Sequence, residues 1–231
     1  MNKDLTVLYQ QKAEETGRML VSLRNHSRAF ILTEIGSFLL AIGFVVLYTL
    51  LDNAAWALLC ALAALFLYLY IRRLDVRNDR KIKAGEALLQ VYQNEIDYQH
   101  GNFSGFEAGE QYVCPQHSYT FDMDVFGTGS LFQRMNRSIS TGGSDRLAAC
   151  LSTEWGSAKR GELVGLIRRR TEAVNELGKE ETFLSEFKSL GVKERINTEE
   201  VLKALTAVHH QTFPKIFHST LFRYFCYADL L

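Results

Sequence analysis

Two apolar runs near the amino terminus constrain the fold of this chain most strongly. They cover residues 30–51 and 54–71, and only Asp52 and Asn53 separate them. Each run approaches the ~20 residues that a helix needs to cross the hydrocarbon layer of a bilayer. The first run contains one charged residue, Glu34, and the second contains none. Because both runs are apolar all round, two transmembrane helices are favoured over the buried hairpin of a soluble protein.

Basic residues flank both runs and predict their orientation. They are Arg18, Arg24 and Arg28 before the first run, and Arg72, Arg73, Arg77, Arg80, Lys81 and Lys83 after the second. Basic residues close to the ends of a span stay on the cytoplasmic side. We therefore expect two spans in the cell inner (plasma) membrane, with both termini in the cytoplasm and a very short loop on the far side.

The segments next to the two runs also have helical patterns. Residues 5–27 carry apolar side chains among charges, and residues 76–98 repeat apolar positions every three or four residues. We expect both segments to continue the spans into the cytoplasm and to pack as an antiparallel pair. Residues 1–98 would then form one amino-terminal unit, made of a helix, the transmembrane hairpin and a cytoplasmic helical extension.

The rest of the chain predicts a connector and a helical domain. Residues 99–127 contain glycines, Pro115 and several aromatic residues, and we interpret them as an extended connector that lies across the following domain. Residues 128–231 predict an all-α domain. Its expected helices are residues 130–136, 141–151, 159–177, 180–190 and 198–212, with Asn197 and Glu200 as an amino-terminal cap of the last.

Within residues 117–151, a Gly-Ser-Leu helix start is followed by a polar turn, a glycine and a second helix. The residues of this pattern are Gly129, Ser130, Leu131, Phe132, Met135, Asn136, Arg137, Ser138, Ser140, Gly143, Leu147 and Leu151. The pattern resembles the start of the helical core of MutS-type DNA mismatch-repair proteins. In that family a Gly-Ser-Leu-Leu start precedes a Leu-Asp-Arg-Thr-x-Thr turn, a Gly, and a helix that ends in Trp-Leu. Cys150 stands where the family usually has Trp.

A second block continues the resemblance in the same order along the chain. It consists of Ile167, Arg170, Ala173, Val174 and Leu177, which match an Ile-x-x-Arg-x-x-Ala-Val-x-x-Leu helix of such cores. Together the two blocks cover about residues 112–207 and imply an incomplete MutS-core-like domain, because these cores continue through long lever and clamp helices. The resemblance implies a core or interface position for Arg170. Arg168 and Arg169 are expected to face water, with contact to DNA phosphates as the alternative.

The nucleotide-binding part of that family is missing from this sequence. Its ATPase domain opens with a Gly-x-x-x-x-Gly-Lys-Ser/Thr loop that cradles phosphates, and no such loop occurs here. The glycine-rich segments 127–130 and 142–144 lack the lysine, so we interpret both as helix starts with serine caps. ATP and magnesium are therefore implied only for a MutS-type ATPase partner or a missing domain. A fragment, a split gene product and a relative that lost its ATPase all stay open.

Charge and cysteine usage limit the remaining possibilities. The chain has 26 basic and 26 acidic residues, which argues against a large electrostatic footprint for nucleic acid over the whole chain. The four cysteines are Cys60, Cys114, Cys150 and Cys226, and their spacing predicts no disulfide framework. Cys114 and His117 have metal-like spacing, but no second pair lies at a matching distance, so we predict no metal site.

These observations lead to two hypotheses. The first is a membrane-anchored MutS-like core segment, related to DNA mismatch repair or DNA-structure binding, that acts as a relay or binding module without catalytic residues or a cofactor of its own. Its expected partners are the lipid bilayer, a MutS-type ATPase domain or chain, DNA and a second copy of the chain. The alternative is a membrane scaffold or protein-interaction module that kept the helical core but does not bind DNA.

Overall fold

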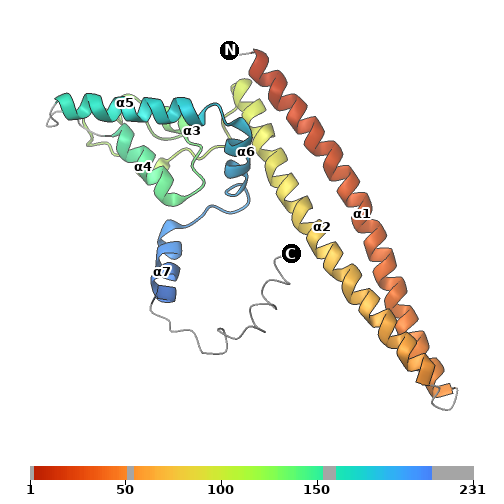
Figure 1. The fold of residues 1–231 in the computed structure, drawn as a ribbon. Coiled ribbons are helices and arrows are strands. Elements are labelled where there is room, and N and C mark those ends of the chain that lie inside the picture. Colours follow the sequence, from red (N-terminus) through yellow and green to blue (C-terminus); the bar gives the residue numbers. More distant parts are fainter. Residues whose placement is uncertain (1–2, 51–54, 153–159, 210–231) are drawn as a thin grey trace.

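The computed structural model describes residues 3–50, 55–152 and 160–209 (Figure 1). This part of the chain forms seven α-helices and one short 3-10 helix. Extended pairing among the described residues is limited to one isolated bridge between Ser140 and Ile196. The prediction of an all-α chain is therefore confirmed.

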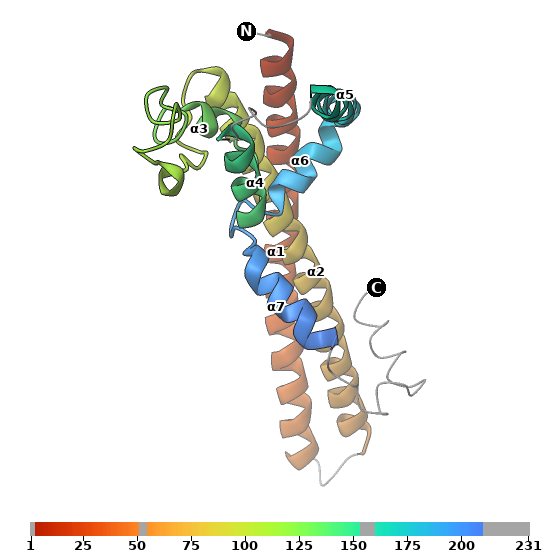
Figure 2. The ribbon, with the colours of Figure 1, turned by 90° about the vertical axis from the view of Figure 1, so that its left-hand side faces the viewer.

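A long helical hairpin dominates the molecule. Helix α1 covers Lys3–Leu50 and helix α2 covers Ala55–Gln99, and the two lie side by side and antiparallel in both ribbon views (Figures 1 and 2). Each is one continuous helix that joins an apolar half to a polar half, because neither sequence contains a proline within these bounds. The expected antiparallel pairing of the polar extensions is confirmed. The expected loop at Asp52 and Asn53 lies outside the described residues.

The apolar half of the hairpin exposes most of its side chains. Both helices are long and apolar enough to span a membrane, and only 11% and 22% of their most apolar windows are buried. Leu32, Leu59 and Phe66 are each at least two-thirds exposed. The seam between the helices contains Ala57, Ala61 and Ala64, all buried. Small residues at such a seam let two helices approach closely, as in membrane helix pairs.

Polar contacts hold the other half of the hairpin in register. The Nδ2 of Asn78 donates to the carbonyl of Leu23 at 2.9 Å, and the hydroxyl of Ser27 donates to Asp75 at 3.2 Å. At the boundary between the two halves, the buried Glu34 accepts from Arg72 at 3.0 Å. A slip of either helix by one turn would break these bonds and leave polar groups unpaired, so they specify the register.

A small helical unit packs at the end of the hairpin where α1 begins and α2 ends (Figure 1). It contains α3, Leu131–Met135, α4, Thr141–Leu151, and α6, Glu181–Ser189. Its core is built around the fully buried Phe132. Val125, Phe126 and Ala148 complete this core, and Tyr112, Tyr119, Leu147 and Leu151 pack against it.

The segment 99–127 differs from the extended connector that we expected. It folds into successive turns and a 3-10 helix at Glu110–Tyr112, and its last residues, Val125 and Phe126, are buried in the core of the helical unit. The amide of Phe132 donates to the carbonyl of Val125 at 2.9 Å. The aromatic residues that suggested an extended connector instead pack against one another, so the segment is part of the helical unit.

Two further helices extend from this unit. Helix α5, Arg160–Leu177, projects from it, and Leu166 is the one described side chain on α5 that is even partly buried. Helix α7, Thr198–His209, starts at the predicted cap, where Asn197 Oδ1 accepts from the amide of Glu199 at 3.1 Å and Asn197 Nδ2 donates to Glu200 at 3.0 Å. The expected continuation to residue 212 lies outside the described residues.

Close packing of α1 on α2 depends on a glycine at position 85. A Cβ atom built on Gly85 would lie 2.9 Å from Cδ2 of Leu20, whose side chain is 3% exposed and has little room to move. We expect Gly85→Val to destabilise the protein by ~1–3 kcal/mol through overpacking. Urea unfolding in non-ionic detergent, followed by circular dichroism, measures the change. Gly17→Val is the matched control, because a Cβ there meets nothing within 4 Å. Equal effects at both positions would contradict the packing argument.

Candidate functional site: the joint between hairpin and helical unit

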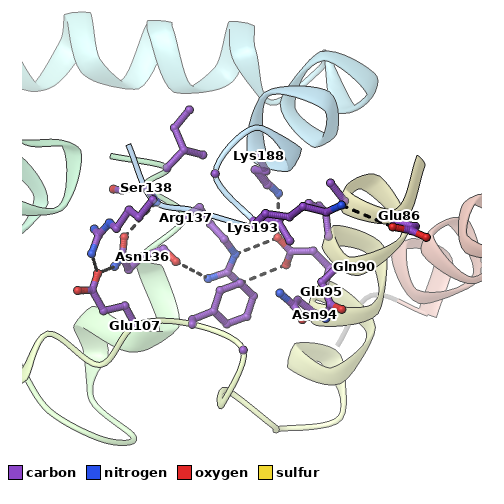
Figure 3. Close-up of a pocket in the computed structure, with 18 residues that line it drawn as sticks. Glu86, Gln90, Asn94, Glu95, Glu107, Asn136, Arg137, Ser138, Lys188 and Lys193 are labelled. Carbon is purple, nitrogen blue, oxygen red and sulfur yellow. Dashed lines mark hydrogen bonds and ion pairs between the residues drawn. The ribbon is translucent and has the colours of Figure 1, made fainter. Parts of the chain in front are cut away.

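A buried carboxylate joins the hairpin to the helical unit (Figure 3). Glu95 lies on α2, and its side chain is 8% exposed. Nε of Arg137 donates to Oε1 of Glu95 at 2.9 Å, and Nη2 donates to Oε2 at 3.2 Å. Nζ of Lys188, from α6, donates to Oε1 at 2.8 Å. We call this three-residue cluster the joint. It connects α2, the turn after α3 and α6 at one point.

Aromatic rings and carbonyl oxygens hold the guanidinium of Arg137 in place. Its plane lies over the ring of Phe106, with the guanidinium carbon 3.6 Å from the ring centroid, and 4.6 Å from the centroid of Tyr98. Nη1 donates to the carbonyl oxygens of Arg134 at 3.0 Å and Asn136 at 3.3 Å. Forked hydrogen bonding combined with ring contact requires the planar guanidinium, so lysine would reproduce only part of these contacts.

Electrostatics favour the ionised form of Glu95. Burial is the largest single influence and would raise its pKa, but hydrogen bonds and charge from Arg137 and Lys188 together outweigh it, so the pKa of Glu95 lies below its ordinary value. The negative charge of Glu95 also affects Tyr9 of α1. Its burial, followed by the Glu95 and Glu181 carboxylates, raises the pKa of Tyr9 to about 12. The Tyr9 ring packs on Tyr92, so α1 is also coupled to this region.

A second polar cluster secures the turn that carries Arg137. Arg195 donates to the carboxylate of Glu107 and to the hydroxyl of Ser144, which is fully buried. Nδ2 of Asn136 donates to Glu107 at 3.4 Å, and Oδ1 of Asn136 accepts from the amide of Ser138 at 3.0 Å. Segments on both sides of the turn are therefore tied to it, which holds Arg137 in position against Glu95.

A cleft of about 760 Å³ lies beside the joint. Four basic side chains line it, and each has a carboxylate partner. Arg137 and Lys188 share Glu95, while Lys193 lies 3.5 Å from Glu86 and Arg195 pairs with Glu107. Because opposite charges are matched within the cleft, the arrangement suits a structural connection better than capture of a charged ligand.

The residues of the first MutS-like block take framework positions around this joint. Ser130 and Ser140 cap α3 and α4, since their hydroxyls accept from the amides of Gln133 and Gly143 at 3.2 Å each. The prediction that both glycine-rich segments are helix starts is confirmed. Gly129 has a φ of +78°, a conformation that L side chains rarely adopt.

The apolar residues of that block divide between core and surface. Leu147 and Leu151 pack against the core cluster around Phe132. Leu131 and Met135, in contrast, are about half exposed. Some residues of the first block are therefore part of the core, and others are on the surface of the described part of the chain.

The second block lies on α5, away from the joint. Arg168, Arg169 and Arg170 are all exposed, as expected for the first two. Arg170 was expected at a core or interface position. Its side chain is exposed, so the core alternative is wrong, and the interface alternative stays a prediction. Val174 and Leu177 of the same block are also exposed. The structure thus does not bring the two blocks together.

Cys114 and His117 have local partners in the structure. Sγ of Cys114 lies 3.6 Å from Oε1 of Gln116, and Nε2 of His117 lies 3.0 Å from the carbonyl oxygen of Ser152. The imidazole also packs edge-on against the ring of Tyr119, at 4.8 Å between centroids. Among residues 3–50, 55–152 and 160–209, no group of three or more His, Cys, Asp or Glu side chains is placed to hold a metal.

Sequence reasoning missed Glu95, Glu107, Lys188 and Arg195 as site residues. One signal was available for Glu95, which falls on the same helical face as Val91 and Tyr92, both buried. A charged residue within an apolar stripe requires a partner of opposite charge. The sequence could not identify that partner, because Arg137 and Lys188 lie 42 and 93 residues further along the chain.

Comparison with known proteins gives no assignment for the chain. No family model matches it, and no match was found among curated proteins or among solved structures. The resemblance to MutS-type cores thus depends on the residues of the two blocks alone.

Removal of Arg137 should destabilise the joint strongly. Arg137→Ala leaves the buried Glu95 with Lys188 alone, and breaking a buried ion pair costs about 3–5 kcal/mol. Arg134→Ala is the matched control, because Arg134 is exposed and its guanidinium lies over Phe103 at 4.7 Å, a contact worth about 0.5–1 kcal/mol. Denaturant unfolding in detergent compares the two. Arg137→Lys should fall between wild type and Arg137→Ala. Similar losses for both alanine variants would contradict the assigned role of the joint.

The joint should also make stability depend on pH in the acid range. A lowered pKa means that the folded protein binds the Glu95 proton more weakly than the unfolded chain. The contribution of Glu95 is therefore complete above the unfolded pKa of about 4.3 and is lost as pH falls through the folded pKa. We expect the unfolding free-energy difference between wild type and Glu95→Gln to be largest above about pH 5 and to shrink on acidification.

Glu14 provides the control for this experiment, since its side chain is 70% exposed and its ion pair with Arg18 lies on the surface of α1. Glu14→Gln should change the free energy of unfolding little at any pH. A Glu95→Gln difference that stays constant down to about pH 3 would contradict the ionised, ion-paired state of Glu95.

Proposed function

We propose that this chain is a membrane-anchored MutS-like core segment, related to DNA mismatch repair or DNA-structure binding. It acts as a relay or binding module and has no ATPase of its own. The observation that carries the proposal is the position of the MutS-like turn. Arg137, a residue of that turn, binds the hairpin through a forked pair with Glu95.

The hairpin supplies the anchor in this proposal. Its apolar half exposes large side chains such as Leu32 and Leu59, which water disfavours and lipid accommodates. The basic residues that flank the two runs favour a cytoplasmic position for both termini. The helical unit packs at the hairpin end that carries the amino terminus (Figure 1). With the proposed topology the unit would lie in the cytoplasm.

The relay would work through rigid contacts. Helix α2 continues without interruption from the apolar half to Glu95, so no flexible linker separates the bilayer from the joint. A displacement of the turn around Arg137 would shift α2, and a displacement of the hairpin would shift the turn, because coupling between two sites is reciprocal. ATP and magnesium would act in a partner ATPase domain or chain, whose movements the joint transmits.

DNA would be the second partner of such a module. Arg168, Arg169 and Arg170 stand exposed in consecutive positions on α5, where they are accessible to phosphates. Log affinity falls as log salt rises, and each phosphate contact that is lost makes this slope shallower by about one. A variant with all three arginines changed to alanine should therefore bind mismatched or branched DNA more weakly and with a shallower salt slope. Fluorescence anisotropy with the full chain in nanodiscs measures both quantities.

Copurification tests the relay proposal as a whole. The native protein would be extracted from its source membranes in mild detergent, and both its intact mass and its companions would be identified by mass spectrometry. The proposal predicts a stoichiometric companion that carries a phosphate-binding loop, or a mass above 26.3 kDa that includes one. A lone chain of 26.3 kDa that shows no salt-sensitive DNA binding would contradict it, as would ATP hydrolysis by the purified chain itself.

A membrane scaffold is the second candidate function, and the surface of α5 favours it. Val164, Ile167, Val174 and Leu177 are each about half exposed or more, and they recur at three- and four-residue spacing with Arg170 between them. Helices in proteins gain most of their stability from packing of an apolar face, so a partner that covers this face would stabilise α5. The scaffold function predicts a protein partner whose binding is lost in Ile167→Glu and kept in Arg169→Glu. It also predicts that the chain does not bind DNA.

A further inference from the structure

Helix α7 leaves the helical unit from a firmly held start. The amide of Thr198 donates to the hydroxyl of Thr141 at 3.1 Å, and the amide of Gly142 donates to the hydroxyl of Thr198 at 3.0 Å. Just before the helix, the bridge between Ser140 and Ile196 ties the chain to the start of α4. The first turn of α7 is therefore fixed, and this fixes the direction in which the helix runs.

That direction leads toward the apolar half of the hairpin. In both ribbon views α7 descends from the helical unit toward the hairpin end where α1 ends and α2 begins, and α5 stays near the opposite end (Figures 1 and 2). If the apolar half spans a bilayer, the carboxyl end of α7 points at the cytoplasmic surface of that bilayer. Helix α5 does not approach it.

The side chains of α7 are divided between an apolar and a polar face. Val201, Leu205 and Val208 recur every three or four residues, and Leu202 widens the same face. The four are 44%, 61%, 51% and 56% exposed, respectively, so no described residue covers them. The opposite face carries Glu199, Lys203 and Thr206. An amphipathic helix with such an open apolar face is suited to a lipid interface.

The distribution of charge along the sequence agrees with this orientation. The acidic residues Glu199 and Glu200 stand in the first turn of α7, next to the bonds that hold Thr198 on the helical unit. Beyond α7 the sequence contains Lys215 and Arg223 among many aromatic residues and has a single acidic residue, Asp229. Basic and aromatic residues favour an anionic headgroup region, while acidic residues are best kept away from it.

We propose that the apolar face of α7 lies in the cytoplasmic interface of the same bilayer that the hairpin spans. This inference rests on the membrane anchor of the proposed function. The occupant of the face is lipid, and α7 gives the helical unit a second contact with the membrane besides the hairpin. Two separate contacts with the bilayer would hold the unit at a defined tilt relative to it.

Site-directed spin labelling of the full chain in nanodiscs tests this contact. The bilayer would contain one-third anionic phosphatidylglycerol, and the four native cysteines would be replaced by alanine or serine. Single labels would replace Leu205 on the apolar face, Thr206 on the polar face as its matched control, and Leu40 in the apolar half of the hairpin as the membrane reference. Oxygen, which concentrates in lipid, and a water-soluble nickel chelate would serve as the two relaxation agents.

The expected result is a severalfold higher ratio of oxygen to nickel accessibility at Leu205 than at Thr206, with Leu40 higher still. A nickel-accessible label at Leu205 would overturn the proposal. Low access to both agents at Leu205 would also overturn it, and dipolar broadening would then identify a second copy as the occupant. Neither result affects the anchor as long as Leu40 reports lipid. A nickel-accessible Leu40 would instead refute the anchor, and the inference with it.

Discussion

The ion-paired carboxylate of Glu95 is the interaction on which the rest of the arrangement depends. A charge buried in a protein interior requires partners, and Glu95 finds them in Arg137 and Lys188, from two other elements. Matching hydrophobic residues could give similar stability, but they would fix the orientation of the helical unit less sharply than a forked hydrogen-bonded pair. The joint therefore specifies how the helical unit sits on the hairpin as well as holding it there.

Because α2 is one continuous helix, it connects the joint directly to the apolar half of the hairpin. The helix has 45 residues and is about 68 Å long at 1.5 Å per residue. Ala61 in the apolar seam and Glu95 in the joint are positions on one rigid rod. Asn78 and Gly85 hold α1 against it between these two points. An anchor and a core-like turn are thus joined without a hinge, which distinguishes this architecture from a domain tethered by a flexible linker.

Local signals predicted most of the helices, and long-range contacts account for what they missed. Apolar periodicity and serine or asparagine caps located α4 and the start of α7 to within a residue. The aromatic segment before Phe126 was expected to be extended, because composition does not reveal that its last residues are buried against Phe132. The resemblance implied a core or interface position for Arg170, and the core alternative is wrong because the side chain is exposed on α5. In the joint, Glu95 binds Arg137 and Lys188, which lie 42 and 93 positions further along the chain. Residue spacing in the sequence does not reveal contacts at such separations.

The most direct test of a rigid joint is the distance distribution between the hairpin and the helical unit. Spin labels at Arg18 on α1 and Arg146 on α4, both exposed, would be measured by double electron–electron resonance in nanodiscs, in a cysteine-free background. The account predicts one narrow distribution for the wild-type joint and a broad one for Glu95→Gln combined with Arg137→Ala. A distribution that is broad in the wild type, or equally narrow in both proteins, would contradict the claim that the joint fixes the unit on the hairpin.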